Sequence, residues 1–127
     1  MTIAIGVDIV EIKRISEAFA RQGDKLVTRI LTAPEKERFD SIANQQTKIA
    51  FLAKRWSAKE AISKALGTGI AKGIGWQEME ILNDDLGAPS VSLKGAAQER
   101  LIKVTGSKVL ISLSDERHYA VAYCTIV

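Results

Sequence analysis

The sequence predicts one α+β domain, residues 1–127, in which an antiparallel sheet packs against a long central helix. Thr47–Leu66 predicts the helix, because it contains no glycine or proline and has apolar residues at three- and four-residue steps. Apolar runs of strand length near both ends of the chain predict the sheet. A chain of 127 residues has room for one core. One strand, then helices, then hairpin-connected strands is an order typical of the α+β class.

The first half of the chain is predicted to be mainly helical. Ile3–Asp8 is interpreted as a buried strand, and Ile9–Arg21 as a helix that ends at Gly23. A further helix over Pro34–Asn44 begins with the pattern of a capping box, a threonine followed three residues later by a glutamate. These two residues are Thr32 and Glu35.

The second half is predicted to consist mainly of strands and turns. It opens with a glycine-rich loop, whose backbone can approach a ligand closely, and it ends in a hairpin. The expected elements are the loop Gly67–Gly75, strands at Glu78–Leu82 and Ser90–Leu93 around the turn Asn83–Pro89, a helix at Gly95–Val104, and the hairpin strands Val109–Ser114 and Tyr119–Ile126.

Composition narrows the range of functions. The chain is 46% hydrophobic and 26% charged, as globular proteins are; it has no apolar run long enough to span a membrane and no recognisable signal peptide. Its single cysteine, Cys124, excludes an internal disulfide and fits the reducing cytoplasm. Its single histidine, His118, argues against a His-rich zinc site, so a bound metal should have oxygen ligands. The net charge of +3 fits an acidic or phosphate-rich partner, and equally an ordinary solvated surface.

Two carboxylates stand out against apolar surroundings. Continuing the apolar steps of the long helix through Trp56 leads to Glu60, and an unpaired carboxylate in a core is strongly disfavoured. Asp8 closes the apolar run at the N-terminus. Two acids from separate segments suggest a Mg²⁺ site, because Mg²⁺ usually takes one or two protein carboxylates and leaves its other positions to water and phosphate. In the alternative interpretation, Asp8 caps the following helix and Glu60 pairs with a nearby lysine or arginine.

Basic residues near these acids suggest a polyphosphate ligand. Lys64 lies one helical turn beyond Glu60, and the glycine loop follows it. Lys54 and Lys59, on the same helix, are expected to be solvated. Two cations share an exposed face of the first helix and could bind an acidic protein helix or RNA. In the alternative interpretation, which applies to most such faces, they are simply solvated. These cations are Arg14 and Arg21.

Several segments, in order over essentially the whole chain, resemble the bacterial holo-[acyl-carrier-protein] synthases. The most specific part of the resemblance is the motif G-x-D followed by a basic residue, together with the motif W/F-x-x-K-E-A-x-x-K. The matching segments are Gly6–Arg14, Leu31–Glu35, Phe51–Gly69, Asn83–Pro89 and Ser112–Ala120.

The resemblance implies the fold and the activity of short-chain 4′-phosphopantetheinyl transferases. These enzymes move the 4′-phosphopantetheine group of coenzyme A onto a serine of acyl carrier protein, release adenosine 3′,5′-bisphosphate and support fatty acid biosynthesis. They form trimers with active sites between the subunits. The expected partners are therefore acyl carrier protein, coenzyme A and further copies of the chain, with Mg²⁺ as cofactor and no nucleic acid.

The resemblance also implies roles for residues of this chain. Asp8 and Glu60 are expected to hold Mg²⁺, Lys64 to approach the phosphates of coenzyme A, and Arg55 to lie by its adenosine 3′-phosphate. The nucleophile belongs to the carrier protein, so the predicted catalytic residues are Glu60 and Lys64, with either Glu60 or a water molecule as the base. Loop glycines are expected to contact coenzyme A, and two arginines to meet the acidic recognition helix of the carrier protein. These residues are Gly67, Gly69, Arg14 and Arg21.

One position departs from the family pattern. Many members have a histidine after the hydrophobic-Ser/Thr pair near the C-terminus, where this chain has Asp115. An ionised aspartate cannot donate a hydrogen bond to a phosphate, so the nucleotide contact of that histidine is not transferred to Asp115.

A hypothesis from another class remains, namely a non-catalytic basic module that binds acyl carrier protein or RNA. Such a module gives no reason for Glu60 to lie on an apolar stripe. Its binding residues would be Arg14, Arg21, Lys25 and Arg29.

Overall fold

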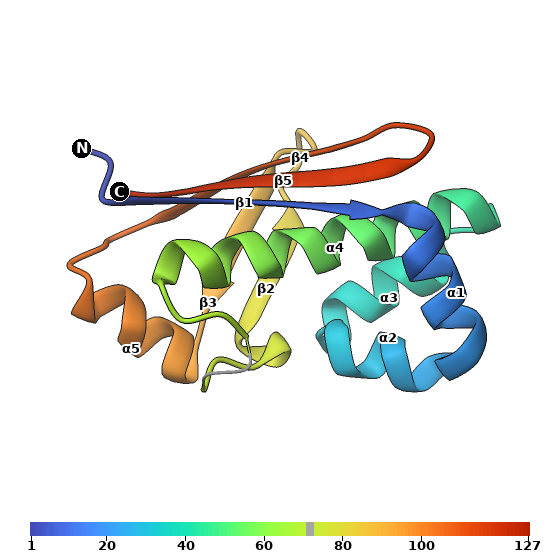
Figure 1. Ribbon diagram of the computed structural model, residues 1–127, viewed down its shortest axis with the longest axis horizontal. Coiled ribbons are helices and arrows are strands. Elements are labelled where there is room, and N and C mark those ends of the chain that lie inside the picture. Colours follow the sequence, from blue (N-terminus) through green and yellow to red (C-terminus); the bar gives the residue numbers. More distant parts are fainter. Residues whose placement is uncertain (71–72) are drawn as a thin grey trace.

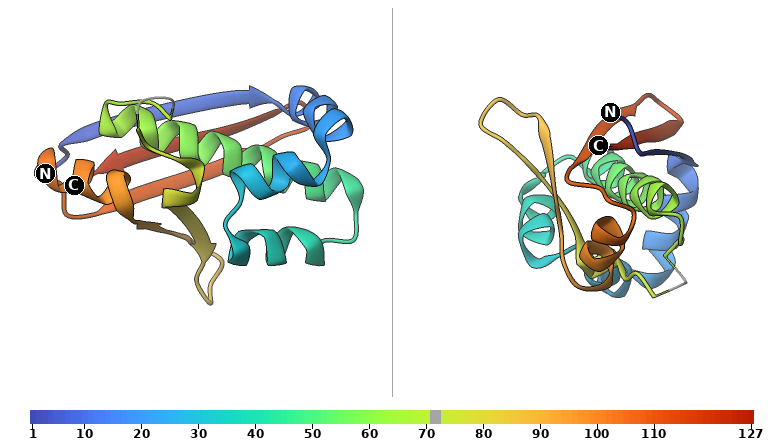
Figure 2. Two further views of the ribbon diagram at one scale, coloured as in Figure 1. Left: turned by 90° about the horizontal axis from the view of Figure 1, so that it is seen from below. Right: turned by 90° about the vertical axis from the view of Figure 1, so that its left-hand side faces the viewer.

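A long central helix, α4, organises the structure, a computed structural model that describes residues 1–70 and 73–127. A three-stranded antiparallel sheet lies along one side of α4 (Figure 1). The other face of this sheet is not covered by any element of the described chain (Figure 2). The predicted α+β class, with an antiparallel sheet packed against a long central helix, is confirmed. The helix is α4 (Gln45–Leu66), and the strands in spatial order are β1 (Ala4–Glu11), β5 (Tyr119–Ile126) and β4 (Val109–Asp115).

The remaining elements surround the other sides of α4. Three helices gather at its N-terminal half, and one helix and a two-stranded hairpin lie beside the rest of it (Figure 1). Buried apolar side chains accordingly form two clusters, one with the three helices and one with the sheet, the hairpin and the last helix. These elements are α1 (Ile12–Gln22), α2 (Asp24–Ile30), α3 (Ala33–Ser41), the short 3₁₀ helix η1 (Trp76–Glu78), β2 (Met79–Asn83), β3 (Pro89–Leu93) and α5 (Gly95–Lys103).

Local signals explain where α4 begins and ends. The side chain of Asn44 accepts a hydrogen bond from the backbone N–H of Thr47 at 3.0 Å, so the helix starts at Gln45, slightly before the predicted start. Gly67 ends it in the left-handed conformation with φ 84°, which favours glycine. No helix within residues 1–70 and 73–127 is both long and apolar enough to cross a membrane.

Two predicted boundaries are wrong. The first strand does not end at Asp8 but continues to Glu11, which pairs with Tyr119 of β5, and α1 begins at Ile12 instead of Ile9. The apolar residues after Asp8 suit a strand as well as a helix, and pairing with β5 decides between the two. The predicted helix Pro34–Asn44 ends at Ser41, since Asn44 caps the next helix.

The other predicted elements are present with small shifts of their ends. Glu35 accepts the backbone N–H of Thr32 at 2.8 Å, as the predicted capping box requires. The strands of the C-terminal hairpin and the helix that starts at Gly95 lie where they were predicted. Residues 71–72 of the predicted glycine loop lie outside the described residues.

Candidate functional site

The site depends on a close approach of β1 to α4 at Gly6. A Cβ atom at Gly6 would lie 2.1 Å from the backbone oxygen of Ala61 and 2.8 Å from the backbone nitrogen of Ala65, so only glycine allows this packing. Side chains two residues apart on a strand point to the same side. Asp8 therefore faces α4 as Gly6 does.

Asp8, Glu60 and Lys64 come together at this contact. Lys64 Nζ donates to Asp8 Oδ1 at 3.0 Å and to the backbone oxygen of Val7 at 3.1 Å. Burial, and then the negative charge of Asp8, raise the pKa of Glu60 above its ordinary value, whereas the positive charges of Lys64 and Arg14 act in the opposite direction. The structure thus brings together three residues that the sequence singled out.

These two carboxylates fit a divalent cation. The raised pKa of Glu60 shows that the nearby cations do not fully compensate the burial of its carboxylate and the charge of Asp8. The described part of the chain has no cluster of three or more acidic, histidine or cysteine side chains, and Mg²⁺ needs only one or two carboxylates. The alternative role of Asp8 as a helix cap is wrong, because Asp8 lies inside β1 and the N-cap of α1 is Glu11.

The stripe that led to Glu60 rises towards the surface along α4. Ile49 and Leu52 are buried, Trp56 and Glu60 are half-buried, and Lys64 is exposed. Glu60 therefore lies at the boundary of the core and not inside it. At this boundary a ligand can reach its carboxylate.

The two arginines of α1 lie on its exposed face, as predicted. The guanidinium carbon of Arg14 is 6.0 Å from the ring centroid of Trp56, which packs against Trp76 with 4.9 Å between the rings. Arg14 also contributes to the electrostatics of Glu60. Arg21 lies near the end of α1, two turns farther along.

The glycines that follow α4 lie beside Lys64. The N–H of Gly67 donates to the backbone oxygen of Lys64 at 3.0 Å, and the N–H of Gly69 donates to that of Ser63 at 3.2 Å. Between them, the buried hydroxyl of Thr68 has no hydrogen-bond partner among the residues that the structure describes. Sequence reasoning did not single out Thr68, although its position between two glycines was visible.

Arg55 lies on another side of α4. It precedes Glu60 by five residues, which at about 100° per residue places the two side chains about 140° apart around the helix. Arg55 Nε donates to the backbone oxygen of Ile81 at 3.1 Å, and Nη2 donates to Asn83 Oδ1 at 3.0 Å. Its guanidinium also lies over the ring of Phe51, 4.4 Å from the centroid. The structure does not bring Arg55 to Asp8 within one chain.

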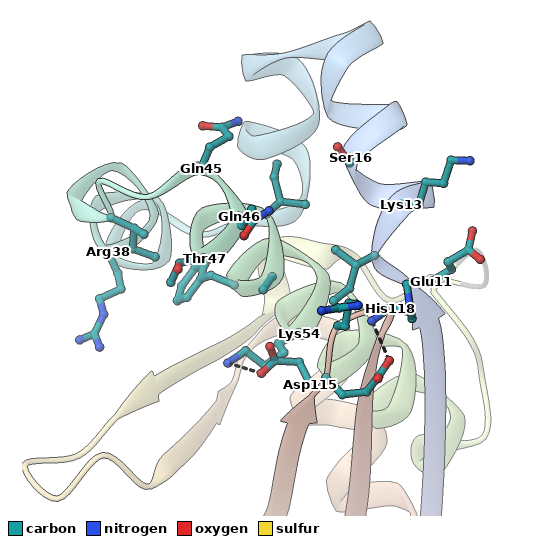
Figure 3. A pocket seen from close by; sticks show the side chains of 17 residues that line it. Glu11, Lys13, Ser16, Arg38, Gln45, Gln46, Thr47, Lys54, Asp115 and His118 are labelled. Atoms are coloured by element: carbon teal, nitrogen blue, oxygen red, sulfur yellow. Dashed lines mark hydrogen bonds and ion pairs between the residues drawn. The ribbon is translucent and has the colours of Figure 1, made fainter.

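Three hollows with basic residues in their lining lie along this side of α4, and Arg55 lines the two smaller ones. A hollow of about 1120 Å³ is lined by Arg38, Lys54 and Asp115 among others (Figure 3), and smaller ones of about 410 and 300 Å³ adjoin Arg38 and Arg55. Lys54 and Asp115 form a half-buried ion pair with 3.1 Å between Nζ and Oδ1. Lys54 is thus not the freely solvated lysine that was predicted. Asp115 pairs with a cation, in line with the view that it is not a phosphate donor.

Lys59 shows where sequence reasoning failed. It was predicted to be solvated, but its side chain is fully buried and its Nζ lies 2.6 Å from Glu35 Oε1. The prediction is wrong because α4 is enclosed by other elements on most sides, so a position off its apolar stripe is still inside the core.

Comparisons with known proteins agree with the resemblance in the sequence. Residues 4–124 match the family model of the 4′-phosphopantetheinyl transferase superfamily. The chain is 48% identical over 120 residues to the holo-[acyl-carrier-protein] synthase of Shewanella amazonensis, with 94% of each chain covered. It is 50% identical over 120 residues to that of Vibrio vulnificus, with 94% of this chain and 93% of the relative covered.

Solved structures with similar folds carry the same description. The holo-[acyl-carrier-protein] synthase of Neisseria meningitidis superposes with a TM-score of 0.90 at 35% identity, covering 100% of this chain and 99% of that chain. The holo-(acyl-carrier-protein) synthase of Bacillus anthracis, solved in complex with CoA (3′,5′-ADP), superposes with a TM-score of 0.82 at 33% identity, covering 99% and 96%.

Proposed function

Because the chain belongs to the holo-[acyl-carrier-protein] synthases of the 4′-phosphopantetheinyl transferase superfamily, we propose that it transfers 4′-phosphopantetheine from coenzyme A to a serine hydroxyl of apo-acyl carrier protein. The reaction depends on Mg²⁺ and releases adenosine 3′,5′-bisphosphate. Residues 1–127 act as one transferase domain. The observation that carries the proposal is the meeting of Asp8, Glu60 and Lys64 where Gly6 lets β1 touch α4.

Each residue of this cluster has a part in the reaction. Asp8 and Glu60 hold Mg²⁺, which when bound neutralises negative charge on the pyrophosphate of coenzyme A. Lys64 binds the same pyrophosphate and stabilises the charge that develops as the bond to adenosine 3′,5′-bisphosphate breaks. Glu60, directly or through a water molecule, takes the proton of the attacking serine.

The rest of coenzyme A is bound by residues at some distance from this cluster. Arg55 contacts the adenosine 3′-phosphate, and Arg38 and Lys54, in the same hollow, add positive charge. The loop with Gly67 and Gly69 lies near the phosphates that Lys64 binds, where the buried hydroxyl of Thr68 is available to donate a hydrogen bond.

We propose a homotrimer with active sites between the subunits. Arg55 and Glu60 of one chain face different sides of α4, so the two halves of the coenzyme A site meet only if neighbouring copies supply one half each. Alternate side chains of β1 form an apolar strip on the uncovered face of the sheet, and large exposed apolar patches mark interfaces. The number three comes from the resemblance. The strip consists of Ile5, Val7 and Ile9, which are 60%, 55% and 63% exposed.

Carrier protein meets the exposed face of α1. Arg14 and Arg21 present positive charge there, which suits the acidic recognition helix of acyl carrier protein. Charge complementarity of this kind speeds association and selects the partner. We place the activity in the cytoplasm and in fatty acid biosynthesis.

Intact-mass spectrometry tests the proposed reaction. Apo-acyl carrier protein is incubated with this chain, coenzyme A and Mg²⁺, with an EDTA control. The expected result is a mass gain of one phosphopantetheine group that appears only with metal. No gain with a verified carrier protein would refute the proposal, and salt-sensitive binding without transfer would favour the basic module.

A further inference from the structure

Three charged side chains lie in the core between α3 and α4, where charged residues are rarely found unless they are paired. The side chains of Glu35 and Lys59 are 0% exposed and that of Arg55 is 4% exposed. Glu35 Oε1 lies 2.6 Å from Lys59 Nζ, and Glu35 Oε2 lies 3.9 Å from Arg55 Nε. The carboxylate of Glu35 therefore faces two cations, and Glu80 adds a second negative charge near Lys59.

Glu35 and Arg55 are both hydrogen-bonded to the backbone of Ile81. Glu35 Oε2 accepts the N–H of Ile81 at 2.8 Å, while the backbone oxygen of the same residue accepts from Arg55 Nε at 3.1 Å. Ile81 is thus fixed between the carboxylate and the guanidinium. A displacement of the Glu35 carboxylate moves this point of β2, and with it the main anchor of Arg55.

Lys59 locks Glu35 in this orientation. Its Nζ donates to Glu35 Oε1, to the backbone oxygen of Ile30 at 2.6 Å and to that of Trp76 at 3.1 Å, which uses all three ammonium hydrogens. Glu35 Oε1 accepts a second hydrogen bond from the N–H of Thr32 at 2.8 Å. Each charged group therefore has one defined position, and a carboxylate that moved would leave buried donors unpaired.

Stability alone does not account for this network. Replacing a buried ion pair with apolar side chains of similar volume is often neutral or even stabilising, since both ions must be stripped of water. Burial lowers the pKa of both Lys59 and Arg55, and the charge of Glu35 opposes this effect. Of the three charged residues, Arg55 lines a hollow together with Arg38 and Lys54, and three cations around one hollow favour an anion.

We propose that Glu35 is a positioning residue, which through Ile81 and Lys59 orients the guanidinium of Arg55 towards the 3′-phosphate of coenzyme A. The proposal rests on the proposed function, in which Arg55 contacts that phosphate. The carboxylate of Glu35 is fully buried, and it contacts Lys59, Arg55 and backbone N–H groups but neither Asp8 nor Glu60. It therefore affects recognition of the 3′-phosphate and leaves the transfer step, at Asp8 and Glu60, unchanged.

The test compares coenzyme A with 3′-dephospho-coenzyme A as substrates of Glu35→Gln in the full chain. We expect the KM for coenzyme A to rise about tenfold, as for the loss of one oriented charged contact, with kcat and the KM for 3′-dephospho-coenzyme A within about twofold of wild type. Arg55→Met should reduce the discrimination between the two substrates at least as much, and adding Glu35→Gln to it should change nothing further. Glu99→Gln, the same change at an exposed position of α5, is the matched control and should behave as wild type.

A second variant covers the case in which Glu35→Gln does not fold, because it leaves the Lys59 ammonium buried without its counter-ion. Glu35→Leu combined with Lys59→Met removes both charges, keeps similar volumes and should fold, as judged by circular dichroism, with the same loss of discrimination. A folded variant with wild-type discrimination, or with equal losses for both substrates, would overturn the proposal. Failure of both variants to fold would assign the network to stability and overturn it as well.

These outcomes are distinguishable from a failure of the proposed function. A wild-type chain that transfers nothing contradicts that function, and the same comparison is then made by calorimetry with adenosine 3′,5′-bisphosphate and adenosine 5′-monophosphate. If the wild type discriminates between the two substrates and Arg55→Met discriminates equally well, the role of Arg55 is contradicted. An effect of Arg55→Met without an effect of Glu35→Gln contradicts only the positioning role.

Discussion

Gly6→Ala is expected to disturb the site without removing any of its functional side chains. The added Cβ would lie 2.1 Å from the backbone oxygen of Ala61, whereas ordinary van der Waals contact begins at 3.4 Å. Both nearest atoms, this oxygen and the nitrogen of Ala65, belong to the helix backbone and cannot rotate away. β1 and α4 must therefore move apart by about 1 Å, and Asp8 moves with the strand.

The size of the effect follows from this displacement. Overpacking of a core costs about 1–3 kcal/mol, and a clash between backbones belongs at the upper end of that range. For a domain of this size, a loss of about 2–3 kcal/mol lowers the melting temperature by roughly 10 °C. A misplacement of about 1 Å between Asp8 and the pair Glu60 and Lys64 should lower kcat/KM for transfer by about 100-fold.

The assay is the rate of carrier-protein modification at a temperature where the variant is folded, together with thermal unfolding by circular dichroism. Gly75→Ala is the control, because Gly75 has φ −95° and the nearest atom to an added Cβ is 3.9 Å away. It should leave stability and rate near wild type. Ala61→Gly should not rescue Gly6→Ala, since the clash is with a backbone oxygen. Wild-type stability and rate in Gly6→Ala would refute the reasoning. Full activity with lowered stability would show that the geometry of the site does not depend on this contact.

The other predictions concern charge, docking and the thiol. The raised pKa of Glu60 means that its ionised form destabilises the metal-free fold, and this penalty appears as pH rises from 4.5 through the raised value. Glu60→Gln should therefore melt higher than wild type in EDTA near neutral pH and equally at pH values below 4.5; a lower melting temperature near neutral pH contradicts this. Asp8→Asn should lower transfer by about 100-fold with calorimetric binding of carrier protein largely intact, and retained transfer would exclude the metal assignment. Arg14→Glu or Arg21→Glu should mainly raise the KM for carrier protein in steady-state assays, and an unchanged KM would remove the docking role of α1. Burial raises the pKa of the Cys124 thiol to about 12, so iodoacetamide should label it in urea and not in the native protein; native labelling, seen by mass spectrometry, would contradict this burial.

Much of the fold and the centre of the site could be predicted because their signals are local. The long helix has an uninterrupted apolar period, and the terminal hairpin has apolar strands around a short polar turn. Glu60 was found because a carboxylate breaks the apolar stripe, and Lys64 follows it at one turn. Asp8 was connected with Glu60 by a chemical argument, since two acids next to apolar segments suggest a shared metal ion.

What could not be predicted depends on tertiary packing. Lys59 lies beside Glu60 in sequence, but whether its side chain reaches water or the core depends on α3, which brings Glu35 to it. Pairing with β5 sets the length of β1, and the sequence around Ile9 does not encode it by itself. The helical period alone predicts that Arg55 and Glu60 lie on different sides of α4. The proposal that neighbouring copies supply the two halves of one site also depends on the uncovered sheet face and the hollows beside α4, which only the structure shows.

Binding of Mn²⁺, followed by electron paramagnetic resonance, tests the central claim that Asp8 and Glu60 form a divalent metal site. Mn²⁺ accepts the same oxygen ligands as Mg²⁺ and can replace it as a probe. Titration in the presence of coenzyme A should show bound Mn²⁺ with wild type, and little or none with Asp8→Asn or Glu60→Gln. Equal binding by wild type and both variants would contradict the claim.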